Sequence, residues 1–396
     1  MNILFILDHP KSSGGGHIQG INYYEIFNKI CDDIPNVMQY YLNDKILSGD
    51  ALDRAGATPV EIKFLKIRTK LLEILFKLFP AGMAFNIAKK SRLSIEREIN
   101  KKNIDLVVYL GPSRLLPVIG NINFIISSWD LSHIEDCEFP EVRDPSTYFT
   151  RELWIKTFYR RAVCIIVDSA FSKRQMHSWY GIDPSRIIIV PFEPNPQVAL
   201  KRDDKQPQVQ SDTTRILVPA QFWSHKGHIW VIEAIHRLNL KGVSNLHVTF
   251  VGGDRNSRSK KIKALVDNKN LTSIIHFSGF ISDVDLQSLY AKTDILLFPS
   301  YFGPTNLPPL EGVLNGLPVI MPKKQSFCDF YGNSFFYFDI EEPETLDKII
   351  LNLMGRSEPI DYNDFLQKLE VKRATGRKKL RSVLSQFSAK QKLWKI

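Results

Sequence analysis

The segment "NILFILDHPKSSGGGHIQGINYYEIFNKI", residues 2–30, joins an apolar run to a helical pattern across three glycines. Its continuous aliphatic run, residues 3–7, is typical of a strand buried on both faces of a parallel sheet. The apolar residues that recur after the glycines predict a helix. This order of strand, turn and helix predicts an α/β fold.

The same alternation continues along the chain. Further runs of the strand type stand at 104–111, 124–130, 164–169, 186–191, 215–221, 247–253, 274–279, 294–300 and 318–322. Helical patterns separate them, and one at 283–293 follows Ser282 with Asp285 three residues on, close to a capping box. These runs predict two Rossmann-like, doubly wound domains whose ligands bind beyond the carboxyl ends of the strands.

The polar stretch "ALKRDDKQPQVQSDTT", from Ala199 to Thr214, predicts a linker. We therefore divide the chain into four parts. They are an N-terminal domain at 1–200, a linker at 201–213, a second domain at 214–375, and a basic C-terminal helix at 376–396.

Composition limits the class of protein. The chain has 396 residues with 44% hydrophobic and 24% charged residues, typical of a globular protein. No stretch approaches the roughly 20 apolar residues needed to span a bilayer, and the run at 3–7 is short for a secretory signal, so we expect a cytoplasmic protein. The net charge of +10 favours an anionic partner, but no nucleic-acid-binding pattern accompanies it. The four cysteines form no CxxC pair and are predicted to be buried free thiols.

The segment "PSYFGPTNLPPLEG", residues 299–312, holds one carboxylate, Glu311. Its prolines stiffen the entry to a helix that places Glu311 near its first turn. A carboxylate accepts two hydroxyl hydrogen bonds and therefore suits a vicinal diol. The backbone amides of Thr305, Asn306 and Leu307 are candidates for binding a phosphate.

The segment "PAQFWSHKGH", residues 219–228, places Lys226 in the first strand-to-helix loop of the second domain. A point cation there suits a phosphate. His225 and His228 flank it, but a solvated basic loop is favoured over a metal pair because no carboxylate or cysteine joins them.

Glycines at two strand ends, Gly15 with Gly16 and later Gly253, let a ligand approach the backbone, although a plain turn explains them equally well. Lysine for the phosphate and carboxylate for the ribose together describe a nucleotide-diphosphate site.

These motifs resemble the GT-B retaining glycosyltransferases, family four (glycosyl transferases group 1), nearly end to end. The resemblance rests on "GGGH" at 14–17, "VDSAFSKRQM" at 167–176, residues 219–228, "IHFSGFISDVDLQSLYAKTDILLFPS" at 275–300, and residues 299–320. It implies two Rossmann-like domains facing across a cleft, with the acceptor side in the domain at 1–200 and a last helix, at 376–396, that crosses back to that domain. It also implies a nucleotide-diphosphate sugar as donor, a glycan as acceptor, and a reaction that uses neither an enzymic nucleophile nor a metal.

Two positions depart from the family pattern. The first of the two family glutamates, which contacts the transferred sugar, is replaced by Gly303, so Glu311 inherits only the ribose role. The arginine that precedes the family lysine is replaced by Gln221, while Lys226 keeps its match to the residue that binds the donor diphosphate. "PAQFW" and "GPTN" together indicate a subgroup with a variant donor site.

The acceptor side is expected in the N-terminal domain. The segment 127–144 follows a strand and is dense in polar groups. The resemblance makes Asp130 and His133 candidates for catalytic contacts to sugar or acceptor, and a surface loop rich in acids is the other interpretation.

Two basic segments raise the question of a membrane. From Thr58 the pattern predicts a helix with Lys63, Lys66 and Lys70 on one face, and residues 376–396 are similarly basic. Each fits peripheral contact with an anionic membrane and a lipid-linked acceptor, or a helix packed on its domain.

The sequence thus predicts a retaining transferase that moves a hexose or deoxyhexose to a glycan in cell-surface polysaccharide or glycoconjugate biosynthesis. A non-catalytic nucleotide-sugar-binding subunit is the alternative. A sugar-nucleotide epimerase is disfavoured, since no acid/base groups on both sides of a sugar carbon are evident.

Overall fold

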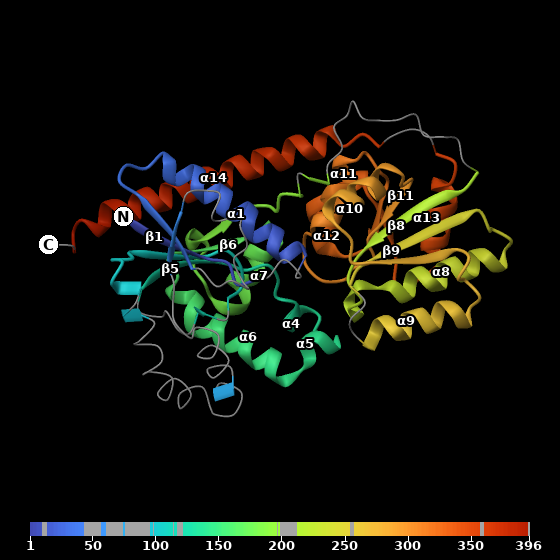
Figure 1. Cartoon of the computed structure of the whole chain (residues 1–396), viewed down its shortest axis with the longest axis horizontal. Coiled ribbons are helices and arrows are strands. Elements are labelled where there is room, and N and C mark those ends of the chain that lie inside the picture. Colours follow the sequence, from blue (N-terminus) through green and yellow to red (C-terminus); the bar gives the residue numbers. More distant parts are fainter. Residues whose placement is uncertain are drawn as a thin grey trace. The chain divides into compact units, whose positions relative to one another are not determined.

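The computed structural model forms two compact units (Figure 1). The first consists of Met1–Glu135, Val142–Phe192 and Glu370–Ile396, and the second of Asp136–Glu141 and Glu193–Leu369. The structure describes residues 1–9, 14–42, 57–60, 74–75, 96–97, 99–113, 115–116, 122–195, 197–198, 212–253, 257–356 and 360–394.

The first unit is built on a seven-stranded parallel sheet of order β3-β2-β1-β4-β5-β6-β7. Its strands are β1 (Asn2–Ile6), β2 (Met38–Leu42), β3 (Thr58–Val60), β4 (Leu106–Tyr109), β5 (Asn123–Ser127), β6 (Cys164–Val167) and β7 (Ile187–Ile189). Its helices include α1 (Gly15–Asp32), α4 (Ser132–Glu135), α6 (Pro145–Phe158) and α7 (Ala170–Tyr180). Short α5 is Pro140–Arg143.

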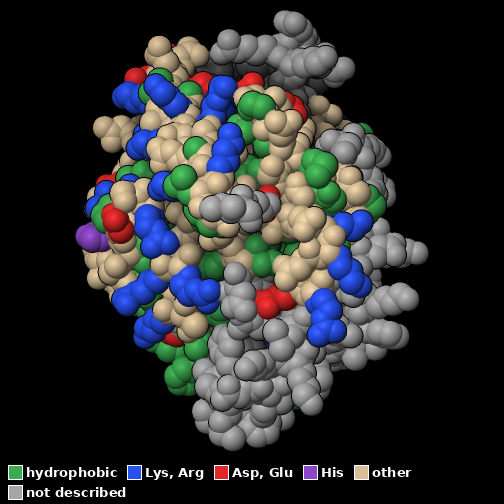
Figure 2. Space-filling view, turned by 90° about the vertical axis from the view of Figure 1, so that its left-hand side faces the viewer, with side chains coloured by type: hydrophobic (Ala, Val, Ile, Leu, Met, Phe, Trp, Pro, Cys, Tyr) green, Lys and Arg blue, Asp and Glu red, His purple; other side chains and the backbone are tan. Residues whose placement is uncertain are grey.

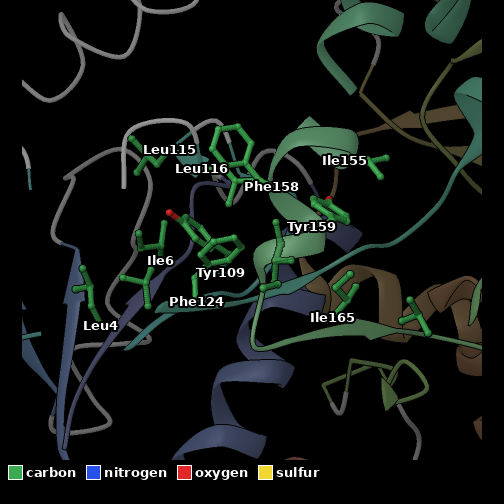
Figure 3. Packing of buried hydrophobic residues seen from close by; sticks show 14 of the residues in the cluster. Leu4, Ile6, Tyr109, Leu115, Leu116, Phe124, Ile155, Phe158, Tyr159 and Ile165 are labelled. Atoms are coloured by element: carbon green, nitrogen blue, oxygen red, sulfur yellow. The ribbon is translucent and has the colours of Figure 1, made fainter. Parts of the chain in front are cut away.

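Alternate residues of β1 face different helices. Phe5 packs edge-on against Tyr24 of α1, with ring centroids 5.0 Å apart. Leu4 and Ile6 point to the opposite face, as the period of a strand requires. There they join a cluster that contains Phe158 of α6 (Figure 3). The sheet is therefore covered on both faces, as the apolar run at 3–7 predicts.

The second unit has a six-stranded parallel sheet of order β10-β9-β8-β11-β12-β13. Its strands are β8 (Thr214–Pro219), β9 (Leu246–Val251), β10 (Ile275–Gly279), β11 (Ile295–Leu297), β12 (Val319–Pro322) and β13 (Phe336–Phe338). Its helices are α8 (His228–Leu240), α9 (Ser257–Asn268), α10 (Asp283–Ala291), α11 (Leu307–Leu314), α12 (Gln325–Tyr331) and α13 (Glu344–Leu353). The predicted α/β class with two doubly wound parallel sheets is confirmed.

Several local predictions can be compared with the structure. Ser282 is confirmed as the N-cap of α10, since its Oγ accepts from Asp285 N at 3.1 Å, while the Asp285 carboxylate accepts from Ser282 Oγ at 2.7 Å. The helix predicted from Thr58 is wrong at its start, because Thr58–Val60 extends the sheet edge as β3 beside β2. Lys63, Lys66 and Lys70 lie outside the described residues.

The cysteine prediction is only partly correct. All four cysteines are free, and Cys31 and Cys164 are buried as expected. Cys328 is half-buried. Cys137 is exposed, because it lies in the connection between α4 and α5 and not in a strand.

The last helix, α14 (Asn363–Gln391), belongs to the first unit from Glu370 onward. It passes close to the end of β7: a Cβ added at Gly376 would lie 2.3 Å from the carbonyl oxygen of Ile189. Arg373 donates to the carbonyl of Phe192. Buried Leu380, Leu384 and Phe387 form its packed face, so this helix uses its apolar side within the unit.

Candidate functional site

The carboxyl ends of β8, β9, β11 and β12 lie at one edge of the second sheet, because all of their pairings are parallel. Lys226 follows β8, and its Nζ donates to Ser300 Oγ, just after β11, at 3.1 Å. The same Nζ lies 5.2 Å from the ring centroid of Phe298. These contacts hold a half-buried cation at the sheet edge.

The loops after β8 and β11 are fastened to each other. Tyr301 N donates to the carbonyl of His225 at 2.7 Å. The rings of His225 and Phe302 stack with centroids 3.9 Å apart and planes 2° apart. Gly227 has φ +61°, and a Cβ there would lie 2.3 Å from the carbonyl oxygen of Pro299. Only glycine permits this close approach.

Two carboxylates of the segment Asp136–Glu141 belong to this edge. Ser224 N donates to Glu141, whose Oε1 lies 3.8 Å from His225 Nδ1. Burial raises the pKa of Glu141, but the neighbouring His225 ring and the hydrogen bond from Ser224 N outweigh it and lower the pKa to about 2. Asp136 accepts from Lys324 Nζ at 2.7 Å in a buried ion pair. The sequence analysis placed this segment in the N-terminal domain, on the acceptor side, whereas the structure places Asp136–Glu141 in the second unit.

Glu311 lies in the second turn of α11, one residue before Gly312, where a Cβ would meet Leu296 Cδ2 at 2.5 Å. The helix therefore packs tightly on the sheet, and Glu311 is buried. Tyr290 Oη of α10 donates to Glu311 Oε2 at 2.8 Å. Burial raises the pKa of Glu311 to about 7, opposed by hydrogen bonds from Tyr290 and the backbone of Asn195.

The turn before α11 differs from the prediction. The helix already begins at Leu307, so Pro308 and Pro309 occupy its first turn, where proline is tolerated. The backbone N–H of Asn306 donates to Tyr331 Oη at 3.2 Å, so this predicted phosphate donor has a partner within the protein. Thr305 is buried beside it.

Gln221 and Gly253 lie at the same sheet edge. Gln221 Oε1 accepts from Trp223 Nε1 at 3.0 Å. Among the described residues, a Cβ added at Gly253 would meet nothing within 4 Å, whereas one at Gly252 would lie 2.3 Å from the carbonyl oxygen of Ala220. Gly252 is thus the structural glycine, and Gly253 borders open space.

His228 begins α8 in the interior. It stacks on Phe222 with centroids 4.6 Å apart, and burial lowers its pKa to about 3. Among the residues that the structure describes, no group of three or more His, Cys, Asp or Glu could hold a metal ion.

In the first unit, Gly15 and Gly16 open α1 after Gly14, which has φ +60°. A Cβ at Gly16 would lie 3.0 Å from Trp129 Cζ3. A Cβ at Gly111 would come within 2.6 Å of Trp129 Cζ2. These glycines therefore make room for an indole that also contacts His9, with ring centroids 4.6 Å apart.

Asp130 and His133 are held by side chains of the first unit. Arg151 Nη1 donates to Asp130 at 2.8 Å and keeps the pKa of Asp130 below its usual range, despite burial, which raises it. His133 is fully buried, with Nε2 3.2 Å from both Glu152 Oε1 and Tyr180 Oη. These two contacts hold His133 inside the first unit, and its role as a sugar or acceptor contact stays a prediction.

Sequence reasoning missed Tyr290, Ser300 and Lys324. Each stands near a recognised motif, but only the fold brings Tyr290 of α10 to Glu311 of α11.

Within the described ranges, no helix is both long and apolar enough to cross a membrane.

Known proteins resemble this chain in sequence and fold. Residues 201–364 match the family model "Glycosyl transferases group 1". The chain is 24% identical over 207 residues to a putative glycosyltransferase 45 of Sulfolobus islandicus filamentous virus, covering 52% of this chain and 54% of that protein. It is 20% identical over 233 residues to the O-antigen chain mannosyltransferase RfbU of Salmonella typhimurium, covering 59% of this chain and 62% of that protein. The chain thus spans little more than half the length of these two relatives.

Among solved structures, HepE of Anabaena in complex with UDP superposes with a TM-score of 0.60 at 15% identity, covering 98% of this chain and 95% of that one. The fold is that of the GT-B glycosyltransferases. The match to the family model is confined to residues 201–364, which lie in the second unit.

Proposed function

We propose that the protein is a retaining glycosyltransferase. It moves a hexose or deoxyhexose from a nucleotide-diphosphate sugar to a glycan acceptor in cell-surface polysaccharide or glycoconjugate biosynthesis, in the cytoplasm. One observation carries the proposal. Within the region that matches the family model, Lys226 is fixed by Ser300 at the sheet edge, and α11, which carries Glu311 in its second turn, follows the same strand β11. The likeness to RfbU and to HepE, solved with UDP, agrees with this substrate class.

The proposed donor site divides its tasks between two residues. Lys226 stabilises the negative charge that develops on the leaving diphosphate, which is where fixed cations contribute most to rate. Glu311 accepts hydrogen bonds from the ribose hydroxyls. The Gly253 backbone, next to open space, lines the donor site.

The proposed reaction is a substitution with retention. The bond between the sugar C1 and the diphosphate oxygen breaks, and the acceptor oxygen bonds to C1 on the same face. The acceptor's proton passes to the departing phosphate oxygen, so no protein nucleophile is required. The protein contributes positioning and electrostatic stabilisation, without a metal.

The test is a panel of thermal shifts with UDP, GDP, dTDP and ADP, followed by hydrolysis of the sugar nucleotide that matches the best ligand. Stabilisation by one base with slow hydrolysis supports the transferase. Stabilisation without turnover, with acceptors supplied, supports the non-catalytic subunit. No response to any of the four overturns the site built on Lys226 and Glu311.

The proposal extends to peripheral contact with an anionic membrane and a lipid-linked acceptor. Residues 371–394 include eight lysines and arginines and no acid. Leu393 and Trp394 at the end are 76% and 56% exposed. Figure 2, which views the side of Figure 1 where the termini are marked, shows many Lys and Arg side chains. Clustered basic residues attract anionic lipid, and tryptophan favours the interface.

Co-sedimentation with vesicles containing phosphatidylglycerol tests this contact. The variant K378E/K379E/W394A should bind less than the wild type. K260E/K261E, which makes the same charge change on exposed α9, is the matched control. Equal binding by all three proteins would contradict the contact.

A further inference from the structure

Tyr290 is the side chain through which α10 reaches Glu311. Its ring is 1% exposed, and its Oη donates to Glu311 Oε2 at 2.8 Å. The backbone amide of Asn195 gives Glu311 a second hydrogen bond. A carboxylate has about four acceptor positions, so two donors leave capacity for ligand hydroxyls.

The hydroxyl of Tyr290 is not needed to fill space. A phenylalanine would supply the same ring, whereas a buried hydroxyl requires a hydrogen-bond partner. The partner that the structure gives this hydroxyl is Glu311, 21 residues away in sequence. The pair thus links the helix before β11 to the helix after it.

We propose that Tyr290 is a positioning residue for nucleotide binding: its hydroxyl fixes one oxygen of Glu311 and favours the ionised carboxylate that accepts hydrogen bonds from the ribose. Nucleotide affinity is thereby coupled to the protonation of Glu311. The inference rests on the proposed function, because it assumes that Glu311 binds the ribose.

The surroundings of Glu311 set the direction of this coupling. Burial raises its pKa to about 7, the two hydrogen bonds from Tyr290 and Asn195 lower it, and the charge of Asp283 raises it. A protonated carboxyl must donate from one oxygen, so it accepts the diol less well. Affinity therefore increases as pH rises through about 7. Loss of one charge-assisted hydrogen bond would move this midpoint upward by about one pH unit.

The experiment is isothermal titration of UDP, or whichever of the four diphosphates binds, from pH 5.5 to 9. Proteins are the wild type, Y290F, E311Q and the control Y362F. Tyr362 is also buried in the second unit, 4% exposed, and donates to the carbonyl of Leu317 at 2.9 Å and not to Glu311. Dividing each affinity by that of E311Q removes the titration of the diphosphate itself.

We expect Y290F to bind about threefold more weakly than wild type at pH 7.5 and to recover by pH 9, as a midpoint shift of about one unit requires. Y362F should follow the wild type. A Y290F profile that superposes on wild type, or that is weaker by the same factor at every pH, overturns the positioning role.

A second measurement uses wild-type protein alone and remains valid if Y290F fails to fold. The 2′-deoxy analogue of the bound ribonucleotide should lose most of the pH dependence that the ribonucleotide shows, and unchanged pH dependence would contradict the inference. If E311Q binds as wild type does, the proposed ribose role itself fails. If E311Q is weakened but Y290F matches Y362F, only the role of Tyr290 fails.

Discussion

Replacing Glu311 with glutamine should make the stability of the second unit less dependent on pH. The pKa of Glu311 is raised from 4.5 to about 7, chiefly by burial, so the folded state holds a proton that the unfolded state has released. Between these values the folded state binds more protons, and stability falls as pH rises. For one group with these two pKa values, the loss between pH 5 and pH 8.5 is about 2.5 kcal/mol.

The E311Q variant lacks this titration. Its unfolding free energy relative to wild type should therefore increase by about 2.5 kcal/mol from pH 5 to pH 8.5, whatever constant cost the amide adds. Urea denaturation at several pH values measures the difference. A chain of two units need not unfold in one transition. Hydrogen exchange of peptides from α11 therefore identifies which unfolding transition belongs to the second unit.

E141Q is the matched control. The pKa of Glu141 is lowered to about 2, so this carboxyl is ionised in both states above pH 5 and its replacement should give no slope there. If the free-energy difference between E311Q and wild type varies with pH as little as that between E141Q and wild type, Glu311 ionises normally. In that case its buried environment does not favour the protonated form.

Three further outcomes are expected. K226A should lower kcat by about 10²–10³ while changing donor affinity much less, because the lysine acts on charge that develops in the transition state; equal losses in single-turnover rate and donor Kd would indicate simple binding. K324M removes the cation from the buried carboxylate of Asp136 and should lower the unfolding free energy of the second unit, measured in urea, by about 3 kcal/mol. The double variant D136N/K324M should recover part of this loss. If the effects of D136N and K324M are additive, the ion pair is contradicted. Of the four cysteines, Cys137 should react first with a thiol reagent in the native protein, since burial raises the pKa of Cys31 and Cys164 to about 12; mass spectrometry showing earlier labelling of either buried thiol would refute this.

The sequence alone determined the α/β class, because strands buried on both faces are continuous aliphatic runs. The runs that became β1, β4 and β8 could be recognised in this way. Strand β2 and the edge strands β3 and β13 were missed, because tyrosines, polar residues and a proline interrupt the continuous aliphatic pattern in them. Their pairing depends on the rest of the sheet.

The sequence also made Lys226 and Glu311 candidates for a nucleotide-diphosphate site, since a cation and a carboxylate after parallel strands suit such a ligand. Only the tertiary structure decided what surrounds them. Ser300 lies 74 residues from Lys226 in the sequence, and Tyr290 lies 21 residues from Glu311. No helix or strand periodicity predicts contacts between residues so far apart. Only the tertiary structure likewise shows that His133 is fully buried and that burial raises the pKa of Glu311, because desolvation depends on atoms from the whole unit.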